Sequence, residues 1–218
     1  MNKPIIGILG AGKLGTTLGR LLVGAGYSVL ISGSGSAEKI ELTTSILVPS
    51  SEAMTSDEVS ERADIVVLAL PLSKYQDVNP EPLENKLVID AMNYWWEIDG
   101  LENIYSDAEY SSSERVQAHL EKSTVIKAFN HMGYHNLADD ALPDTKENRK
   151  AVAIAGDHMD SVKKVENIVD SIGFTPLYIG ELKNGLILEP GNPLFGASLG
   201  LEETEKQVRE SLEKLNIR

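Results

Sequence analysis

A glycine-rich turn lies between an apolar run and an amphipathic segment near the start of the chain. The run 5–9 has the length and the branched side chains of a buried β-strand. Gly10-Ala11-Gly12-Lys13-Leu14-Gly15 follows as a G-x-G-x-x-G motif, and leucines then recur at helical spacing as far as Leu22. A second strand candidate, 27–31, comes after this helix. The motif therefore has the strand–turn–helix–strand setting that is typical of dinucleotide-binding proteins.

Each glycine of the motif has its own physical reason. Gly10 permits a tight turn, Gly12 lets the backbone approach a pyrophosphate, and Gly15 lets the helix pack closely on the sheet. The free N–H groups and the partial positive charge at the start of a helix favour phosphate binding. We therefore predict that a dinucleotide pyrophosphate is held by residues Gly10, Ala11, Gly12, Lys13, Leu14 and Gly15.

Strand and helix candidates alternate along the rest of the chain. Further apolar runs stand at 64–70, 86–90, 124–129, 151–155 and 176–179. Capping boxes that begin at Thr55 and Ser111 predict helices over 56–62 and 113–121, and Asp157 is expected to cap a helix over 159–171. This alternation predicts an α/β fold that is Rossmann-like and doubly wound, with a mostly parallel sheet.

The later part of the chain departs from this alternation. Residues 136–149 are polar and predict a surface excursion, whereas 201–215 form an amphipathic helix pattern. The turn-rich segment 189–196 is interpreted as a connection to that helix, with a lid as the alternative. We expect an NAD(P)-binding Rossmann domain over 1–180 and a small C-terminal helical extension over 181–218 that packs on it.

Composition narrows the class of protein. A net charge of −13 disfavours nucleic acid as a partner, because such binding is dominated by cationic contacts to phosphate. The chain has no apolar run near the ~20 residues that span a bilayer, and no signal-peptide layout. It lacks cysteine, and its four histidines form no metal-binding motif. We therefore expect a cytoplasmic protein with no metal, membrane or nucleic-acid partner.

The end of the second strand candidate indicates which dinucleotide is bound. An Asp or Glu there would accept hydrogen bonds from the ribose 2′-OH of NAD and would repel a 2′-phosphate. Ser32 and Ser34 stand at this position, and Lys39 follows within a short distance. Hydroxyl groups and a lysine suit a phosphate, which favours NADP(H). A solvated surface lysine is the alternative interpretation of Lys39.

Polar residues follow the later strands, at the edge of the sheet where ligands bind in such folds. Asn93 and Asn130 are candidates to bind the nicotinamide or acceptor carbonyls, and loop capping is the alternative for both. His131 follows a buried strand and is the best candidate in the chain for a proton donor. The alternative for His131 is a structural histidine.

Several segments, in this order, resemble the deazaflavin-dependent NADP oxidoreductases of the coenzyme F-420 type: GILGAGKLG, ISGSGSAEK, VVLALP, a Ser-Ser-Ser-Glu helix start and VIKAFN. They also resemble the cytosolic NADPH-binding domain of the six-transmembrane metalloreductases. The resemblance covers about residues 3–180. It implies a Rossmann domain, commonly dimeric, that transfers a hydride between NADP(H) and a flavin or deazaflavin.

The resemblance also implies roles for individual residues. Residues 10–14 would contact the pyrophosphate, Ser34 and Lys39 would hold the 2′-phosphate, and Leu70 and Pro71 would flank the nicotinamide. The chain departs from the family at Gly35, where the family has an arginine, and in the loop 90–100. The identity of the hydride acceptor is therefore left open.

Three functions are compatible with this sequence. The leading prediction is an NADP(H)-dependent oxidoreductase, acting as a homodimer, that passes a hydride to a flavin- or deazaflavin-like acceptor. The second is a small ketoacid reductase, which we rank lower because about forty residues after 179 cannot supply a large helical catalytic domain. The third is an NADP-binding redox sensor without turnover.

Overall fold

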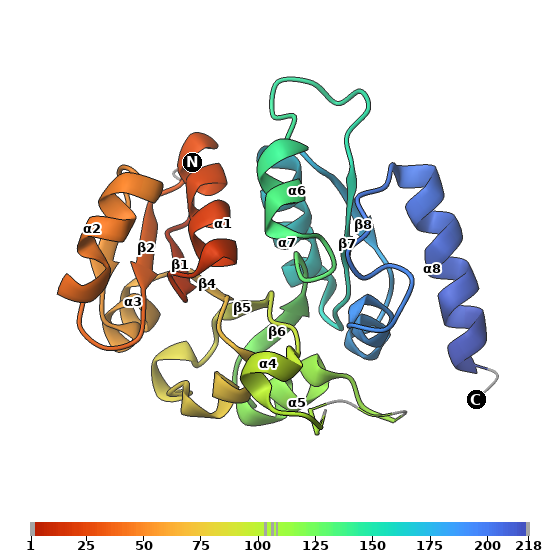
Figure 1. The fold of residues 1–218 in the computed structure, drawn as a ribbon, viewed down its shortest axis with the longest axis horizontal. Helices are drawn as coiled ribbons and strands as arrows, with labels where there is room; N and C mark the ends of the chain where they lie inside the picture. The colour runs from red at the N-terminus through yellow and green to blue at the C-terminus, as the bar shows by residue number, and fades with distance from the viewer. Residues whose placement is uncertain (1–2, 103, 106, 108, 217–218) are drawn as a thin grey trace.

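The computed structural model describes residues 3–102, 104–105, 107 and 109–216, and it has a six-stranded sheet at its centre (Figure 1). The strands lie in the order β3-β2-β1-β4-β5-β6, and each pairs in parallel with its neighbours. Their bounds are β1 (Ile6–Leu9), β2 (Val29–Ser32), β3 (Glu52–Met54), β4 (Ile65–Leu68), β5 (Leu87–Asp90) and β6 (Thr124–Lys127). This order is that of doubly wound dinucleotide-binding folds, so the predicted fold class is confirmed.

Helices connect and cover these strands. The α-helices are α1 (Lys13–Gly24), α2 (Glu38–Leu47), α3 (Ser56–Arg62), α4 (Trp96–Asp99), α5 (Ser112–His119), α6 (Tyr134–Asp139), α7 (Met159–Ser171) and α8 (Leu201–Asn216). Short 3₁₀ segments are η1 (Leu72–Asp77), η2 (Glu81–Leu83) and η3 (Leu182–Leu188). The predicted capping boxes are confirmed, because Glu58 and Glu114 each bond back to the start of their helix.

The sheet is buried on both faces, because successive side chains of each strand point to opposite sides. Ile6 and Ile8 of β1 belong to a core that also contains side chains of α1, α6 and α7. Leu9 belongs to a second core, which includes Val59 of α3 and Val116 of α5. Burial on both sides explains why these strands read as nearly continuous apolar runs in the sequence.

A second, two-stranded parallel sheet follows, formed by β7 (Ala151–Ile154) and β8 (Thr175–Tyr178). An antiparallel bridge between Lys127 and Ala155 joins it to β6. Helix α8 packs Val208 into a third core with residues of β7 and η3, and it lies at the opposite end of the molecule from α2 (Figure 1). The division of the chain at residue 180 stays a prediction.

Two local expectations require correction. Asp157 does not cap α7: the N-cap residue is His158, and Asp157 Oδ1 instead accepts the N–H of Leu182 at 2.9 Å. The excursion 136–149 is only partly irregular, since α6 extends to Asp139. For Asp157, the contact with Leu182 outweighs the local capping pattern.

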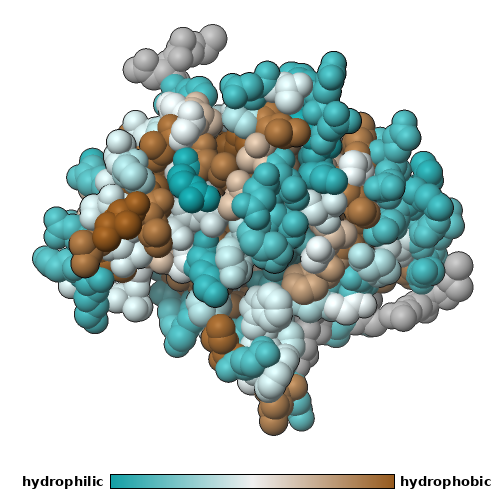
Figure 2. Space-filling model, turned by 45° about the horizontal axis from the view of Figure 1, so that its top comes forward, coloured by the Kyte–Doolittle hydropathy of each residue, from teal (hydrophilic) through white to brown (hydrophobic). Residues whose placement is uncertain are grey.

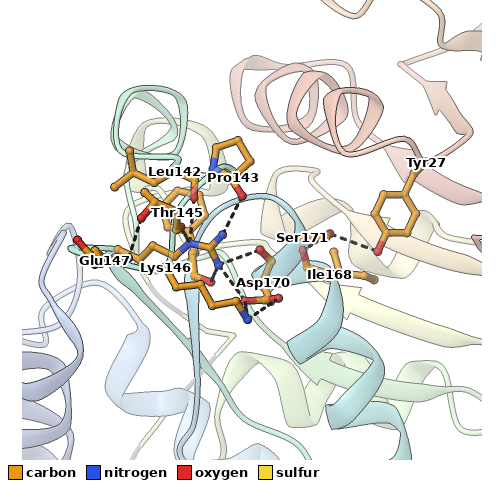
Figure 3. Close-up of polar contacts among 11 residues, drawn as sticks. Tyr27, Leu142, Pro143, Thr145, Lys146, Glu147, Ile168, Asp170 and Ser171 are labelled. Carbon is orange, nitrogen blue, oxygen red and sulfur yellow. Dashed lines mark hydrogen bonds and ion pairs between the residues drawn. The ribbon is translucent and has the colours of Figure 1, made fainter.

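Arg149 connects the segment 136–149 to the end of α7 through hydrogen bonds. Its guanidinium donates to the carbonyl groups of Leu142, Pro143 and Thr145, and also to Asp170 Oδ1 at 2.8 Å. Figure 3 shows Leu142, Pro143 and Thr145 of this loop on one side and Asp170 at the end of α7 beside them. These contacts of Arg149 lie at the C-terminal end of α7, where a cation also interacts favourably with the helix dipole.

The outer surface of α2 is unusually apolar. Leu42 and Ile46 are 72% and 64% exposed, and Figure 2 shows an apolar patch on the flank where α2 lies. None of the helices in the described part of the chain is both long and apolar enough to cross a membrane.

Candidate coenzyme site

The glycine-rich turn joins β1 to α1 and touches the loop that follows β4. Gly10 has a φ of +122°, and a Cβ atom there would lie 2.3 Å from the carbonyl oxygen of Ala69. A Cβ on Gly15 would lie 1.8 Å from the carbonyl oxygen of Gly10. At Gly12, by contrast, a Cβ meets nothing within 4 Å among the described residues. Gly10 and Gly15 are thus required by the fold, whereas Gly12 faces open space.

That open space is a cleft of about 730 Å³ at the carboxyl ends of the parallel strands. It lies between β1 and β4, the point at which the strand order reverses direction, where doubly wound folds bind their ligands. Of the residues predicted to bind the coenzyme, those that line the cleft are Gly10, Ala11, Gly12, Ser34, Leu70 and Pro71.

The other predicted residues of the turn lie around the cleft and outside its lining. Gly15 is buried inside α1, and Leu14 packs against the core. Lys13 Nζ lies 5.2 Å from the centre of the Tyr134 ring on α6, in a cation–π contact. The side chains of Lys13 and Leu14 therefore contact the protein, and the contribution that this turn can make to phosphate binding comes from its backbone.

The end of β2 forms one wall of the cleft. Ser32 is buried, and its hydroxyl lies 3.1 Å from that of Ser56, so it supports the wall from behind. Gly35 has a φ of +92°, and a Cβ placed there would lie 2.9 Å from Lys39 Nζ. The ammonium group of Lys39 is therefore folded back over the loop that contains Ser34.

Sequence reasoning did not assign several other residues that line the cleft. They are Ser56, Asp57 and Ser60 of α3, together with Lys74 and Asp77 of η1. The capping box at Thr55 was a usable signal, because it places the start of α3 directly after the edge strand β3 and hence at the ligand-binding edge of the sheet.

Asn93 and Asn130 are brought together by the loops that follow β5 and β6. Asn93 Nδ2 donates to the carbonyl oxygen of Asn130 at 2.6 Å, and Asn130 Nδ2 donates to Asn93 Oδ1 at 3.1 Å and to the carbonyl oxygen of Leu188 at 2.9 Å. Neither residue lines the cleft of about 730 Å³, although both lie at the same edge of the sheet. Their assignment to the coenzyme stays a prediction.

His131 is buried, with 1% of its surface exposed. Its Nε2 accepts a hydrogen bond from the backbone N–H of Ala153 on β7 at 3.0 Å. Burial lowers the pKa of His131 from 6.5 to about 4, against the opposing effect of the Leu194 and Ala197 backbone. The ring is therefore neutral near pH 7 and contacts the second sheet, outside the lining of the cleft. Its role as a proton donor stays a prediction.

The segment that contains residues 188–196 lies against these loops. In addition to the contact from Asn130 to Leu188, the N–H of Gly196 bonds to the carbonyl oxygen of His131 at 2.6 Å. Glu189 is buried and accepts the first N–H of α5, from Ser112, at 2.7 Å. The Phe195 ring packs edge-on against Trp95 at 5.6 Å between centroids. These contacts favour a fixed connection over a lid.

The described residues contain no group of three or more His, Cys, Asp or Glu side chains that could hold a metal ion. The cleft is lined by the backbone of the glycine turn, by serine hydroxyls, by Lys74 and by the carboxylates of Asp57 and Asp77. The strand order and the position of the cleft together define a fold of the Rossmann type.

Comparison with known proteins shows what the chain is similar to. Residues 5–94 match the family described as NADP oxidoreductase coenzyme F420-dependent. The chain is also 30% identical over 191 residues to the metalloreductase STEAP3 of Rattus norvegicus, an alignment that covers 86% of this chain and 36% of that protein. The chain thus spans about a third of the length of this relative.

Solved structures share the fold of this chain. A hypothetical protein from Sinorhizobium meliloti is 26% identical, with a TM-score of 0.79 and coverage of 91% of this chain and 96% of that chain. An Arthrobacter protein described as an F420-dependent NADP reductase shares the fold at 20% identity and a TM-score of 0.71, covering 84% and 88% of the two chains. Residues 5–94 thus match the family that the sequence motifs resemble, and the 30% identity to a metalloreductase agrees with this resemblance.

Proposed function

We propose that the protein transfers a hydride between NADP(H) and a flavin- or deazaflavin-like acceptor. The observation that carries the proposal is the cleft above Gly12, where a side chain would meet nothing within 4 Å. A pyrophosphate fits this space, because backbone N–H groups at the start of α1 then face its oxygens. When bound, the coenzyme supplies the hydride, and the protein contributes binding, orientation and exclusion of water.

The choice of NADP over NAD is supported by the wall at the end of β2. Ser32 stands where an acidic residue would repel a 2′-phosphate, and Lys39 Nζ lies beside Gly35. We assign the 2′-phosphate to Ser34 and Lys39. Leu70 and Pro71, which line the cleft after β4, would then flank the nicotinamide ring.

The acceptor is assigned to the same edge of the sheet, beyond β5 and β6. Trp95 and Trp96 are 47% and 57% exposed there, and a flat ring system can stack on an exposed aromatic side chain. The amide of Asn93, at the same edge of the sheet, is assigned to the carboxamide of the nicotinamide. Direct hydride transfer needs alignment of two rings more than acid–base groups, which agrees with a site built from loop backbone, amides and aromatic residues.

The test is a titration with NADPH and with NADH, followed by oxidation assays with FMN, FAD, riboflavin and a deazaflavin. Tighter binding of NADPH together with turnover on one acceptor supports the proposal and identifies the second substrate. Tight binding without turnover on any acceptor supports the redox-sensor alternative. Equal binding of NADH contradicts the assignment of Ser34 and Lys39.

We further propose that the chain acts as a homodimer, as the family resemblance implies, and in the cytoplasm, as its composition indicates. The exposed Leu42 and Ile46 on α2 support an association, because covering apolar surface is favourable. Light scattering of the purified protein measures its mass directly. A monomer at micromolar concentration would contradict the dimer.

A further inference from the structure

Asp90 and Lys127 form a fully buried ion pair at the ends of β5 and β6. Lys127 Nζ lies 3.1 Å from Asp90 Oδ2, and both side chains have 0% exposure. The two residues face each other in the register of the parallel strands. The hydroxyl of Ser113 on α5 donates to the same Oδ2 at 2.7 Å. The pair is therefore fixed from three elements.

The pair also forms hydrogen bonds with both the N–H and the carbonyl oxygen of Met92. The N–H of Met92 donates to Asp90 Oδ1 at 2.9 Å, and its carbonyl oxygen accepts from Lys127 Nζ at 2.7 Å. Asn93 is the next residue. The direction in which the chain enters Asn93 is thus set by two charge-assisted hydrogen bonds, which are stronger than bonds between neutral groups.

The loop after Lys127 is held in an uncommon conformation. Phe129 is buried and has a φ of +67°, a value that bulky residues rarely adopt. Asn130 follows and bonds to the side chain of Asn93. Such backbone conformations persist where the surroundings over-determine them, and they cluster at functional sites.

The pairing leaves Asn93 one free donor. Its Nδ2 carries two N–H bonds, and one of them donates to the carbonyl oxygen of Asn130. Asn93 is only half-buried, whereas Asn130 is 2% exposed. Asn93 is therefore the member of the amide pair that can reach a ligand, and Asn130 orients it.

Stability alone does not account for a buried ion pair. Taking two charges out of water carries a large desolvation penalty, and well-packed apolar residues often replace such pairs without loss of stability. Apolar residues at positions 90 and 127 would fill the space, but they could not bond to both the N–H and the carbonyl oxygen of Met92. What the charges add here is a fixed orientation of the loop.

We propose that Asp90 and Lys127 are positioning residues that aim Asn93 at the carboxamide oxygen of the nicotinamide ring. The inference rests on the proposed function, because it takes the dinucleotide to be bound in the cleft. The free N–H of Asn93 donates to the carboxamide oxygen, and this contact fixes the rotation of the ring. Asp90 and Lys127 act only through the backbone of Met92 and do not touch the coenzyme.

The experiment compares three probes by titration: NADP⁺, its thionicotinamide analogue and 2′-phospho-ADP-ribose. The analogue replaces the carboxamide oxygen by sulfur, a weaker acceptor, and the third probe lacks the nicotinamide. We expect the wild-type protein to prefer NADP⁺ over the analogue about fivefold, the size of one net hydrogen bond. The double variant Asp90→Leu with Lys127→Met, which leaves no unpaired charge, should lose this preference and bind 2′-phospho-ADP-ribose as the wild type does.

Three controls complete the design. Asn93→Leu should remove the same preference, and adding it to the double variant should change nothing further. Arg149→Met removes a different buried cation, remote from these loops, and should retain the preference. If the double variant does not fold, Ser113→Ala removes one bond to Asp90 and should reduce the preference in part.

The outcomes separate the two proposals. A wild-type protein that binds neither NADP⁺ nor 2′-phospho-ADP-ribose overturns the proposed function. A wild type that discriminates between NADP⁺ and the analogue, together with folded variants at positions 90, 127 and 113 that discriminate equally well, overturns the positioning role alone. Retained preference in Asn93→Leu overturns the contact assigned to Asn93.

Discussion

The ammonium group of Lys39 lies in the space that a side chain at position 35 would fill, because a Cβ atom on Gly35 would lie 2.9 Å from Lys39 Nζ. A side chain at position 35 and the folded-back lysine therefore exclude one another. The chain has no arginine in this loop, and the lysine from the first turn of α2 brings a cation to the same wall of the cleft. Lys39 is therefore the cation of this loop that lies beside Gly35, where the family has an arginine.

Replacement of this cation should change coenzyme selectivity. We expect Lys39→Met to raise the Kd for NADPH about tenfold, the size of one charged hydrogen bond, and to leave the Kd for NADH unchanged. Titration of both coenzymes measures this. Lys163→Met, at an exposed position on α7, is the matched control and should behave as the wild type. An equal loss for both coenzymes would place Lys39 away from the 2′-phosphate.

The glycine motif allows folding and binding to be separated. Gly12 is the N-cap of α1, with φ −78° and ψ −171°, a conformation open to any residue, and its Cβ would meet only open space. Gly12→Val should therefore unfold at the same urea concentration as the wild type but bind NADPH at least 100-fold more weakly, because its side chain occupies the place of the pyrophosphate. Gly24→Ala, at the far end of the same helix, is the control.

Gly15 provides the opposite case. A Cβ at this position would lie 1.8 Å from the carbonyl oxygen of Gly10, so Gly15→Ala must displace α1 from the sheet. We expect this variant to be destabilised as well as deficient in binding, as measured by urea unfolding. A Gly12→Val protein that unfolds as early as Gly15→Ala would contradict the assignment of Gly12 to the ligand.

Burial of His131 should make stability depend on pH. The pKa of His131 falls from 6.5 to about 4 in the folded protein, because burial disfavours the charged ring. The unfolded chain therefore binds more protons between these two values, and the free energy of unfolding falls as the pH drops from about 6.5 towards about 4. The full contribution, roughly 3 kcal/mol, is present above the unfolded pKa.

A variant isolates this effect. His131→Gln removes the titrating group, so urea unfolding at a series of pH values should show a shallower slope over that range than the wild type. His135→Gln, at an exposed position, should retain the wild-type slope. If His131→Gln also abolishes turnover while NADPH still binds, the residue acts in proton transfer despite its burial.

The sequence predicted those elements whose burial leaves a local pattern. The strands were recognisable because both faces of the sheet are covered, and α3 and α5 because their capping boxes are local. Helix α2 was missed because its apolar residues Leu42 and Ile46 are exposed rather than arranged as a stripe towards the core. Strand β3 was missed because it has three residues, the first of them Glu52.

Only the part of the candidate site that is formed by the glycine turn was predictable from the sequence. The glycine turn carries its own signature, whereas Asp90 and Lys127 lie 37 residues apart and meet only because β5 and β6 are neighbours in register. The surroundings of His131 likewise depend on β7, which begins twenty residues later in the chain and packs against the ring. Such long-range relationships follow from topology, which no local spacing records.

Arg149 gives the last prediction, which concerns stability apart from function. Its side chain is 4% exposed and joins the loop 142–147 to Asp170 at the end of α7. Arg149→Met should lower the free energy of unfolding by about 3 kcal/mol, because charged hydrogen bonds to Asp170 and to several buried carbonyl groups are lost together. Lys146 also pairs with Asp170, but its side chain is 79% exposed, so Lys146→Met should cost less than about 1 kcal/mol. Urea unfolding measures both variants, and NADPH titration below the unfolding transition should give the wild-type Kd for each. A large effect of Lys146→Met on stability would contradict the dominant role of Arg149. Weaker NADPH binding by folded Arg149→Met would contradict the assignment of Arg149 to stability alone.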